Sequence, residues 1–188
     1  MSKLFVDEIV HQSSQGSGTI TLGASGETIT TASGAKFSGI TGQNYPAFEA
    51  DLTADQSSVG DNVVTKVQFD TEIFDTDNCY DNSTNYRFTP TVSGKYFIYS
   101  TVRIDSSTVD KLLNMQIYIY KNGSELNNVR FNFGASALSF RNTGSIFTTT
   151  QLNGTSDYIE IYAKGDVTSG NTNIKENGTV FGAYRIGA

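Results

Sequence analysis

The sequence of 188 residues predicts an all-β protein, a sandwich or jelly roll, and three observations support that fold class. The chain has 12 Phe and 10 Tyr beside many Thr, Val and Ile, the residues that fit the pleated surface of a sheet. Apolar and polar residues alternate with a period of two in several segments. Asn-Gly pairs, which favour tight turns, separate these segments, and no segment has a convincing helical period.

Residues 1–17 combine a short apolar patch with a run of Gln, Ser and Gly. The patch consists of Leu4, Phe5, Val6, Ile9 and Val10. Asp7 and Glu8 interrupt this patch, whereas a signal peptide needs an uninterrupted apolar core. No apolar run in the chain approaches the length of a membrane span. We therefore expect no cleaved export signal and no membrane insertion.

Residues 18–44 contain a repeat in which glycines recur every eight residues, at Gly18, Gly26, Gly34 and Gly42. Short β-like pieces with one or two apolar residues lie between these glycines. Such pieces cannot bury a face alone, so they need stacked neighbours or identical chains. A narrow trimeric β-stem and a linker rich in Gly, Ser and Thr both fit this segment.

Residues 45–188 have the pattern of a globular domain with roughly eight to ten strands, the number expected for a sandwich or jelly roll. Asn122-Gly123, Asn153-Gly154 and Asn177-Gly178 mark the clearest turns. Apolar residues at alternate positions define one face of each of four predicted strands. The four sets are Tyr96, Ile98, Val102 and Ile104 with Ser100; Leu113, Met115, Ile117 and Ile119; Ile159, Ile161 and Ala163; and Val180, Gly182, Tyr184 and Ile186.

The spacing of aromatic residues from Phe69 to Tyr96 resembles the signature of the C1q-like globular domain of the C1q/TNF superfamily. That signature runs Phe-x5-Asn/Asp-x4-aromatic-x6-Phe-x5-Gly-x-Tyr-x-Phe-x-aromatic, and the matching residues are Phe69, Asp75, Tyr80, Phe88, Gly94 and Tyr96. The interval from Tyr80 to Phe88 is one residue longer than the pattern, and Ile98 and Ser100 replace its last aromatic positions. Pro46-Ala47-Phe48 and the segments 152–160 and 179–184 resemble the family's other motifs, in the same order.

The resemblance implies a jelly roll in which Phe69, Phe88 and Tyr96 fill the gap between two sheets. We expect Gly94 to permit a tight turn before a buried strand. The resemblance also implies a tight homotrimer with aromatic and apolar residues on the threefold axis. The candidates for that interface are Tyr118, Tyr120, Phe131, Phe133, Tyr162 and Tyr184.

The N-terminal part of the sequence shows a second resemblance. The opening residues 4–9, followed by Gly26-Glu27-Thr28-Ile29-Thr30, resemble the starts of tail-fibre and other virion appendage proteins of marine bacteriophages. Those proteins often end in a C1q-like tip. The resemblance implies residence in a virion after assembly in the host cytoplasm, with residues 1–17 as the anchor that contacts other virion proteins. The chain has no Gly-X-Y collagen stalk.

Residue types that carry catalysis are sparse in the sequence. His11 is the only histidine and Cys79 the only cysteine, so a Cys-His arrangement or a Cys/His metal set has no support. A net charge of −6 argues against nucleic acid as a partner, because nucleic-acid sites need clustered Lys and Arg. We therefore expect a protein that is not an enzyme.

An acidic stretch that includes Asp75, Asp77 and Asp81 raises the question of calcium. Asp75-x-Asp77 begins like an EF-hand loop, but Tyr80 and Tyr86 stand where that loop needs Gly and Glu. A calcium site of another kind and a turn whose Asp side chains bond their own backbone both remain open. No other cofactor is expected.

These features predict a structural or adhesive component of a phage virion, a fibre or decoration appendage that forms a homotrimer. Residues 1–17 would anchor it, residues 18–44 would form the stem, and residues 45–188 would form the exposed head. Attachment to host-surface glycan is one use of such a head. The alternatives are a free C1q-like lectin or binding module and a glycan depolymerase, although no motif selects the pair of carboxylates that a depolymerase needs.

Overall fold

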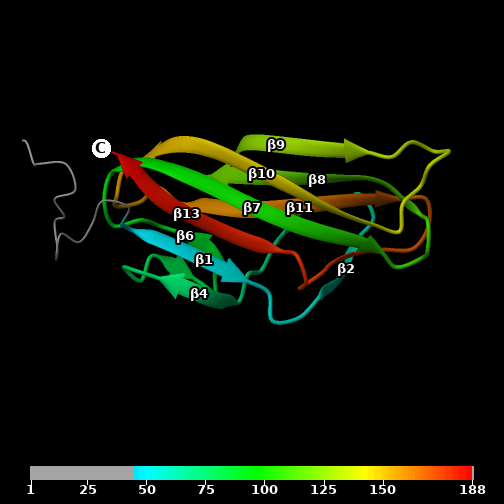
Figure 1. Cartoon of the computed structure of the whole chain (residues 1–188), viewed down its shortest axis with the longest axis horizontal. Coiled ribbons are helices and arrows are strands. Elements are labelled where there is room, and N and C mark those ends of the chain that lie inside the picture. The colour runs from blue at the N-terminus through cyan, green and yellow to red at the C-terminus, as the bar shows by residue number, and fades with distance from the viewer. Residues whose placement is uncertain (1–44, 188) are drawn as a thin grey trace, which may run out of the picture. The chain divides into compact units, whose positions relative to one another are not determined.

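The computed structural model describes residues 45–187, and this part of the chain contains strands, turns and loops but no helix (Figure 1). None of these residues therefore belongs to a helix that could cross a membrane. The predicted anchor with Leu4, Phe5, Val6, Ile9 and Val10, the segment 18–44 and His11 lie outside the described residues. The division of the chain at residues 17 and 44 stays a prediction.

The larger of two antiparallel sheets has seven strands and is organised around one long strand, β7 (Gly94–Ser106). Strand β10 (Arg141–Leu152) pairs with β7 along one side. On the other side β7 pairs first with β13 (Val180–Gly187) and then with β12 (Thr172–Ile174). Strands β1 (Ala47–Asp51) and β4 (Thr71–Asp75) extend the sheet beyond β13, and β2 (Gln56–Gly60) extends it beyond β12.

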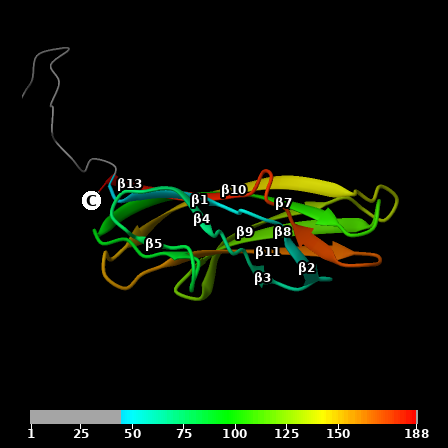
Figure 2. The ribbon, with the colours of Figure 1, turned by 90° about the horizontal axis from the view of Figure 1, so that it is seen from below.

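The second sheet has six strands and lies as a separate layer across the core, which Figure 2 shows with β13, β1 and β10 in one layer and β11 and β5 in the other. Its centre is formed by β11 (Ile159–Val167) and β8 (Leu112–Lys121), with β9 (Ser124–Asn132) at the edge. Three pieces of two residues each complete it: β3 (Thr65–Lys66), β5 (Tyr80–Asp81) and β6 (Arg87–Phe88).

One hydrophobic core fills the space between the sheets. Phe48 lies at its aromatic centre, stacked on Tyr80 and Phe88 at centroid distances of 4.7 and 4.6 Å and edge-on to Phe181 at 4.8 Å. Burying such large side chains is the main force that holds a sandwich together. The two layers therefore share one set of aromatic contacts.

The inward faces of three predicted strands agree with the structure. Tyr96, Ile98, Ser100, Val102 and Ile104 are buried on β7, as are Met115, Ile117 and Ile119 on β8 and Ile159, Ile161 and Ala163 on β11. Leu113 is the exception: it is half-buried and Leu112 enters the core, because the register of β8 against β11 shifts at this end. The prediction for the last strand is wrong, because Phe181 and Ala183 enter the core whereas Tyr184 and Ile186 are exposed. Both parities of that strand carry apolar residues, so alternation alone could not select the inward one.

Thirteen strands occur among residues 45–187, more than the eight to ten expected, because several pieces are too short to show a period of two. Gly94 is the first residue of the buried strand β7, follows the bend at 91–92 and pairs with Leu152. A Cβ at this position would lie 2.4 Å from the carbonyl oxygen of Gly187. Glycine at this position therefore provides room for a neighbouring backbone within the sheet.

Candidate functional site

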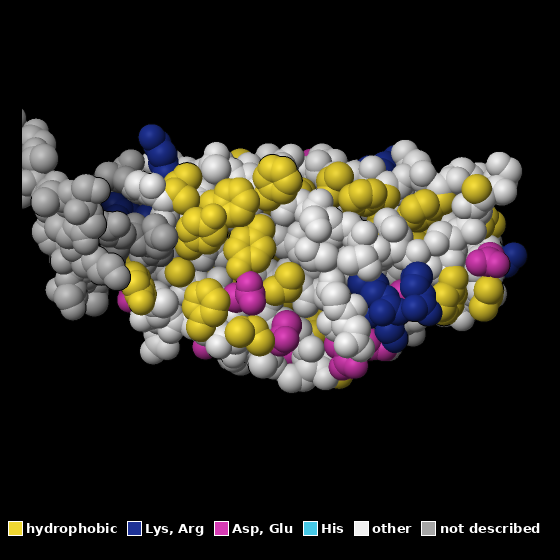
Figure 3. All heavy atoms as spheres, in the orientation of Figure 1, with side chains coloured by type: hydrophobic (Ala, Val, Ile, Leu, Met, Phe, Trp, Pro, Cys, Tyr) yellow, Lys and Arg dark blue, Asp and Glu magenta, His cyan; other side chains and the backbone are white. Residues whose placement is uncertain are grey.

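Four aromatic rings form a cluster on the outward face of the seven-stranded sheet, which we call the aromatic patch: Phe97, Tyr99, Phe147 and Tyr184. The ring of Phe97 is central, with centroids 6.1 Å from Tyr99, 6.1 Å from Phe147 and 5.4 Å from Tyr184. Phe147 is 66% exposed and Tyr184 is 37% exposed. Figure 3 shows hydrophobic side chains gathered on this face. The patch leaves large apolar surfaces in water.

The pleat of the strands creates this patch. Phe97 and Tyr99 alternate on β7 with the buried residues Tyr96 and Ile98, so they point to the opposite face. Phe147 lies directly across from Tyr99 on β10, and Tyr184 lies across from Phe97 on β13. Three neighbouring strands therefore bring residues that are far apart in the sequence onto one surface.

A glycine holds Tyr99 in place. The Tyr99 ring covers Gly182 so closely that a Cβ at that position would lie 2.3 Å from the ring. The hydroxyl of Tyr99 donates a hydrogen bond of 2.5 Å to Oε2 of Glu49. Burial first, and then the bond to Glu49, raises the pKa of Tyr99 well above its usual range. Tyr99 is thus the anchored member of the aromatic patch.

Beside the patch lies a hollow of 470 Å³ that we call the acidic groove. Its carboxylates are Glu49, Asp51 and Glu176, and Ile73 and Val180 provide apolar walls. None of the three carboxylates forms a salt bridge with another residue of the described part of the chain. The acidic groove therefore presents three carboxylates that form no ion pair within the described domain.

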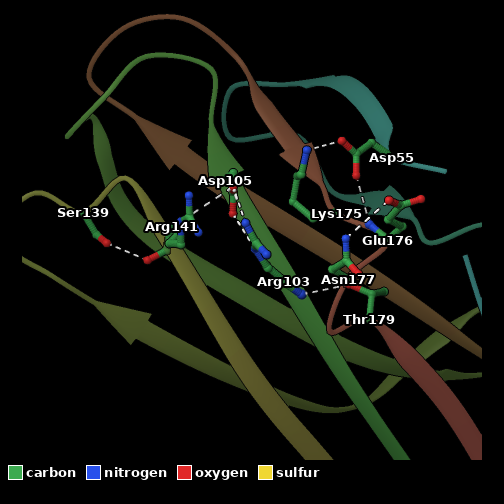
Figure 4. A network of polar contacts seen from close by, with 9 residues as sticks. All are labelled: Asp55, Arg103, Asp105, Ser139, Arg141, Lys175, Glu176, Asn177 and Thr179. Carbon is green, nitrogen blue, oxygen red and sulfur yellow. Dashed lines mark hydrogen bonds and ion pairs between the residues drawn. The ribbon is translucent and has the colours of Figure 1, made fainter.

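The basic side chains further along the same face are, in contrast, already paired (Figures 3 and 4). Arg103 donates two hydrogen bonds to Asp105, of 2.9 and 2.8 Å, and Arg141 lies 3.9 Å from the same carboxylate. Lys175 forms an ion pair with Asp55. These cations form their ion pairs with Asp105 and Asp55, and not with the carboxylates of the acidic groove.

Three tyrosines lie on the outward face of the six-stranded sheet, where polar neighbours surround them: Tyr118, Tyr120 and Tyr162. The Tyr120 and Tyr162 rings are 4.4 Å apart, and Tyr118 is buried against Tyr120. Glu160 is buried beside them and pairs with Lys66 at 2.5 Å. Each of these rings already has a neighbour within the domain.

The predicted trimer-interface residues therefore fall into three places. Tyr118, Tyr120 and Tyr162 lie on the six-stranded face just described. Phe131 and Phe133 pack partly against the core, and the Phe131 ring occupies the space above Gly144 of β10. Tyr184 alone belongs to the aromatic patch.

The aromatic residues that carry the C1q-like spacing are placed in the core. Phe69, Phe88 and Tyr96 are fully buried, and the Tyr80 hydroxyl donates a hydrogen bond of 3.0 Å to the carbonyl of Phe69. Burial raises the pKa of Tyr96 to about 12, and its hydroxyl donates to the carbonyl of Val92. Neither the acidic groove nor the hollow lined by Leu52, Gln56 and Tyr86 includes these rings. Their contacts serve the fold.

Two of the three carboxylates that the sequence offered for calcium, those of Asp75 and Asp81, are engaged by nearby backbone, and no such bond from the described residues reaches the Asp77 carboxylate. Asp81 accepts hydrogen bonds from the backbone N–H groups of Ser83, Thr84 and Asn85. These bonds, led by that of Thr84, hold the pKa of Asp81 well below its usual range. Asp75 accepts bonds from the N–H groups of Asp77 and Tyr80 in the same way. Within residues 45–187 no three acidic, His or Cys side chains are grouped to hold a metal ion.

Sequence reasoning missed Phe97, Tyr99 and Phe147. A signal for the first two existed, because the residues that alternate with the buried positions of β7 are themselves aromatic. Phe147 lies among threonines in β10 and carries no comparable signal. The acidic groove is invisible in the sequence, since its residues come from β1, β4, β7 and the segment 176–180.

Comparisons with known proteins identify the fold. No family model matches the chain, and no curated protein sequence matches it. Among solved structures, murine APRIL at pH 5.0 has a TM-score of 0.53 at 14% identity, covering 74% of this chain and 97% of APRIL. The globular domain of the zebrafish complement 1qA protein has a TM-score of 0.51 at 14% identity, covering 75% and 97%. The fold is a C1q/TNF-like jelly roll.

Proposed function

We propose that this protein is a non-enzymatic structural or adhesive subunit that acts as a homotrimer and associates through the aromatic patch. The observation that carries the proposal is the exposure of Phe147 and Tyr184 beside Phe97 on one sheet face. Contiguous apolar patches of this kind mark interaction surfaces. Aromatic rings also supply much of the binding energy at protein interfaces.

The number three rests on the sequence resemblance to C1q-like domains, whose heads form tight trimers. A ring of three copies uses a heterologous contact, in which one surface of a copy meets a different surface of the next. The aromatic patch supplies one of these two surfaces.

The cellular setting that we propose is a phage virion, as a fibre or decoration appendage. Support comes from two sequence segments that resemble the N-terminal sequences of virion appendage proteins. One is the apolar patch Leu4, Phe5, Val6, Ile9 and Val10, and the other is the segment 26–30. Residues 1–17 would contact other virion proteins, and residues 45–188 would face solvent. Three identical heads would bind a host-surface glycan with the gain of multivalency.

Sedimentation equilibrium of the full chain tests the association. Wild-type protein is expected at three times the chain mass of 20.4 kDa. Phe147→Asp is expected to raise the dissociation constant by about a hundredfold or more, because it replaces the most exposed ring of the aromatic patch with a charge.

Val109→Asp is the matched control, since Val109 is 65% exposed in the loop after β7, away from the aromatic patch. It should assemble like wild type. A monomeric wild type, or equal behaviour of the two variants, would contradict the proposed association.

The virion setting needs a separate experiment on particles. Deletion of residues 1–17 should abolish incorporation of the protein into virions while leaving the trimer of the truncated chain intact. Electron microscopy with a labelled antibody against the head would locate the protein on intact particles. Incorporation of the truncated chain would refute the anchor.

A further inference from the structure

The acidic groove lacks a cation, and the described domain holds an arginine that lacks an anion. Arg130 lies on β9, is exposed, and forms no salt bridge. Strand β9 pairs only with β8, so it is a free edge of the six-stranded sheet. Strand β10 likewise pairs only with β7. Arg130 therefore lies on the edge strand of the six-stranded sheet, beside the side of the sandwich where both sheets end, with its side chain on the outward face that Gln116 shares.

The two free edges lie against one another. The side-chain amide of Asn127 on β9 donates a hydrogen bond of 3.2 Å to the carbonyl of Phe147 on β10. Phe131 of β9 lies over Gly144 of β10. This side of the sandwich is thus a continuous surface that begins next to the aromatic patch, because Phe147 belongs to both.

Arg130 and the acidic groove lie at the same position along the direction of the strands, which we call their level. Ser145 on β10 opposes Thr101 on β7, and Thr101 opposes Val180 on β13. Val180 in turn opposes Asp51 on β1, so Asp51 has the level of Ser145. Arg130 precedes Phe131, whose ring contacts Gly144, the neighbour of Ser145. The level of Arg130 therefore matches that of Asp51.

Equal level matters in a cyclic assembly. The outward directions of the seven-stranded face and of the β9–β10 edge are both perpendicular to the strands. A rotation that brings the edge of one copy onto the face of the next therefore has its axis along the strands. Such a rotation leaves each residue at its own level, so residues that meet must share a level.

We propose that Arg130 of one copy enters the acidic groove of the next copy and pairs there with Asp51, beside Glu49 and Glu176. This inference rests on the proposed self-association and names a polar contact within it. The aliphatic stem of the arginine would pack on Ile73 and Val180, the apolar walls of the acidic groove. The contact would set the register of the copies, while the aromatic patch provides most of the affinity.

A charge-reversal cycle on the full chain tests the pair by sedimentation equilibrium. Arg130→Glu and Asp51→Arg should each raise the dissociation constant of the oligomer by about tenfold or more. The double variant should return to within about threefold of wild type, because it restores opposite charges across the contact. The wild-type constant should also rise with salt more steeply than that of either single variant.

Lys164→Glu is the matched control. Lys164 lies across Gln116 from Arg130 on the same sheet face, and its replacement changes the net charge by the same amount as Arg130→Glu. It should leave the oligomer unchanged.

Each outcome decides between the two proposals. A wild-type oligomer that tolerates both single reversals overturns the Arg130 contact but leaves the aromatic association standing. Weakening by the single variants without rescue in the double variant also overturns the pairing. A wild-type monomer overturns the proposed association and the contact together.

Discussion

The outward faces of the two sheets carry similar numbers of aromatic rings but differ in how far other side chains of the chain cover these rings. On the six-stranded face, Tyr118 is buried and Tyr162 lies beside the Lys66–Glu160 pair, so polar and aromatic neighbours of the same chain cover the rings. On the seven-stranded face, Phe147 and Tyr184 keep large exposed surfaces. Aromatic content alone therefore does not identify an interface, because coverage by the chain's own side chains distinguishes the two faces.

The charges of the two faces repeat the contrast. The buried carboxylate of the six-stranded face, Glu160, has its cation at 2.5 Å. The carboxylates of the acidic groove have none within the described domain. The buried carboxylate of the six-stranded face is thus paired within one chain, whereas the carboxylates of the acidic groove are open to a cation from a partner.

The largest expected effect comes from the core that both faces share. Phe48→Ala should lower the free energy of unfolding by about 3–5 kcal/mol, because it removes a ring that contacts Tyr80, Phe88 and Phe181. Phe147→Ala should change it by less than about 0.5 kcal/mol, measured where the protein is monomeric. Urea denaturation followed by circular dichroism measures both, and similar losses would erase the distinction between core and patch.

The next effect is specific to the six-stranded face. Lys66→Met leaves the buried Glu160 carboxylate without its cation and should cost about 2–3 kcal/mol, less than the about 3–5 kcal/mol of a fully buried pair. Association should stay at the wild-type level. Lys66→Arg keeps the charge and is the control. A loss of association in Lys66→Met would show that the part of this face around Glu160 also contacts a partner.

The same pair makes this effect depend on pH. Burial tends to lower the pKa of Lys66, but the hydrogen bond and charge of Glu160 outweigh burial and raise it. The pair's contribution is therefore complete below the ordinary lysine pKa of about 10.4 and is lost as the pH rises through the raised value. The difference in stability between wild type and Lys66→Met should shrink above that pH.

A smaller effect should follow from crowding Tyr99 on the seven-stranded face. Gly182→Ala places a methyl group 2.3 Å from the present position of the ring and should cost about 1–2 kcal/mol of stability while weakening association. Gly187→Ala, where nothing lies within 4 Å of the added Cβ, is the control. When Tyr99 is already replaced by alanine, Gly182→Ala should cause no further loss in the free energy of unfolding, because the ring that it would clash with is gone. If the losses of the two single variants add up in the double variant, the clash is not the cause.

Local periodicity explains why much of the fold could be predicted. Inward positions such as Ile98, Ile117 and Ile161 follow from a period of two, and turns such as Asn122-Gly123, with φ of 53° and 76°, follow from the residue types. The parity of β13 could not be predicted, because Phe181 and Tyr184 are equally compatible with the core.

The candidate site was harder to predict than the fold because it depends on lateral pairing. Whether Tyr118 or Tyr99 is covered is decided by side chains on neighbouring strands, which the sequence does not place. The acidic groove similarly needs Glu49, Thr101 and Glu176 to be brought together by three separate segments.

The two-sided character of β7 has a consequence for how the chain folds. Tyr96 and Ile98 face the core, whereas Phe97 and Tyr99 face outward, so both sides of this end of the strand are apolar. A slip of one residue would exchange the two sets with little hydrophobic penalty there. At the other end the same slip would bring Arg103 and Asp105 into the core, a far greater cost. The charged end of β7 thus protects the chain from misfolding that its aromatic end would tolerate.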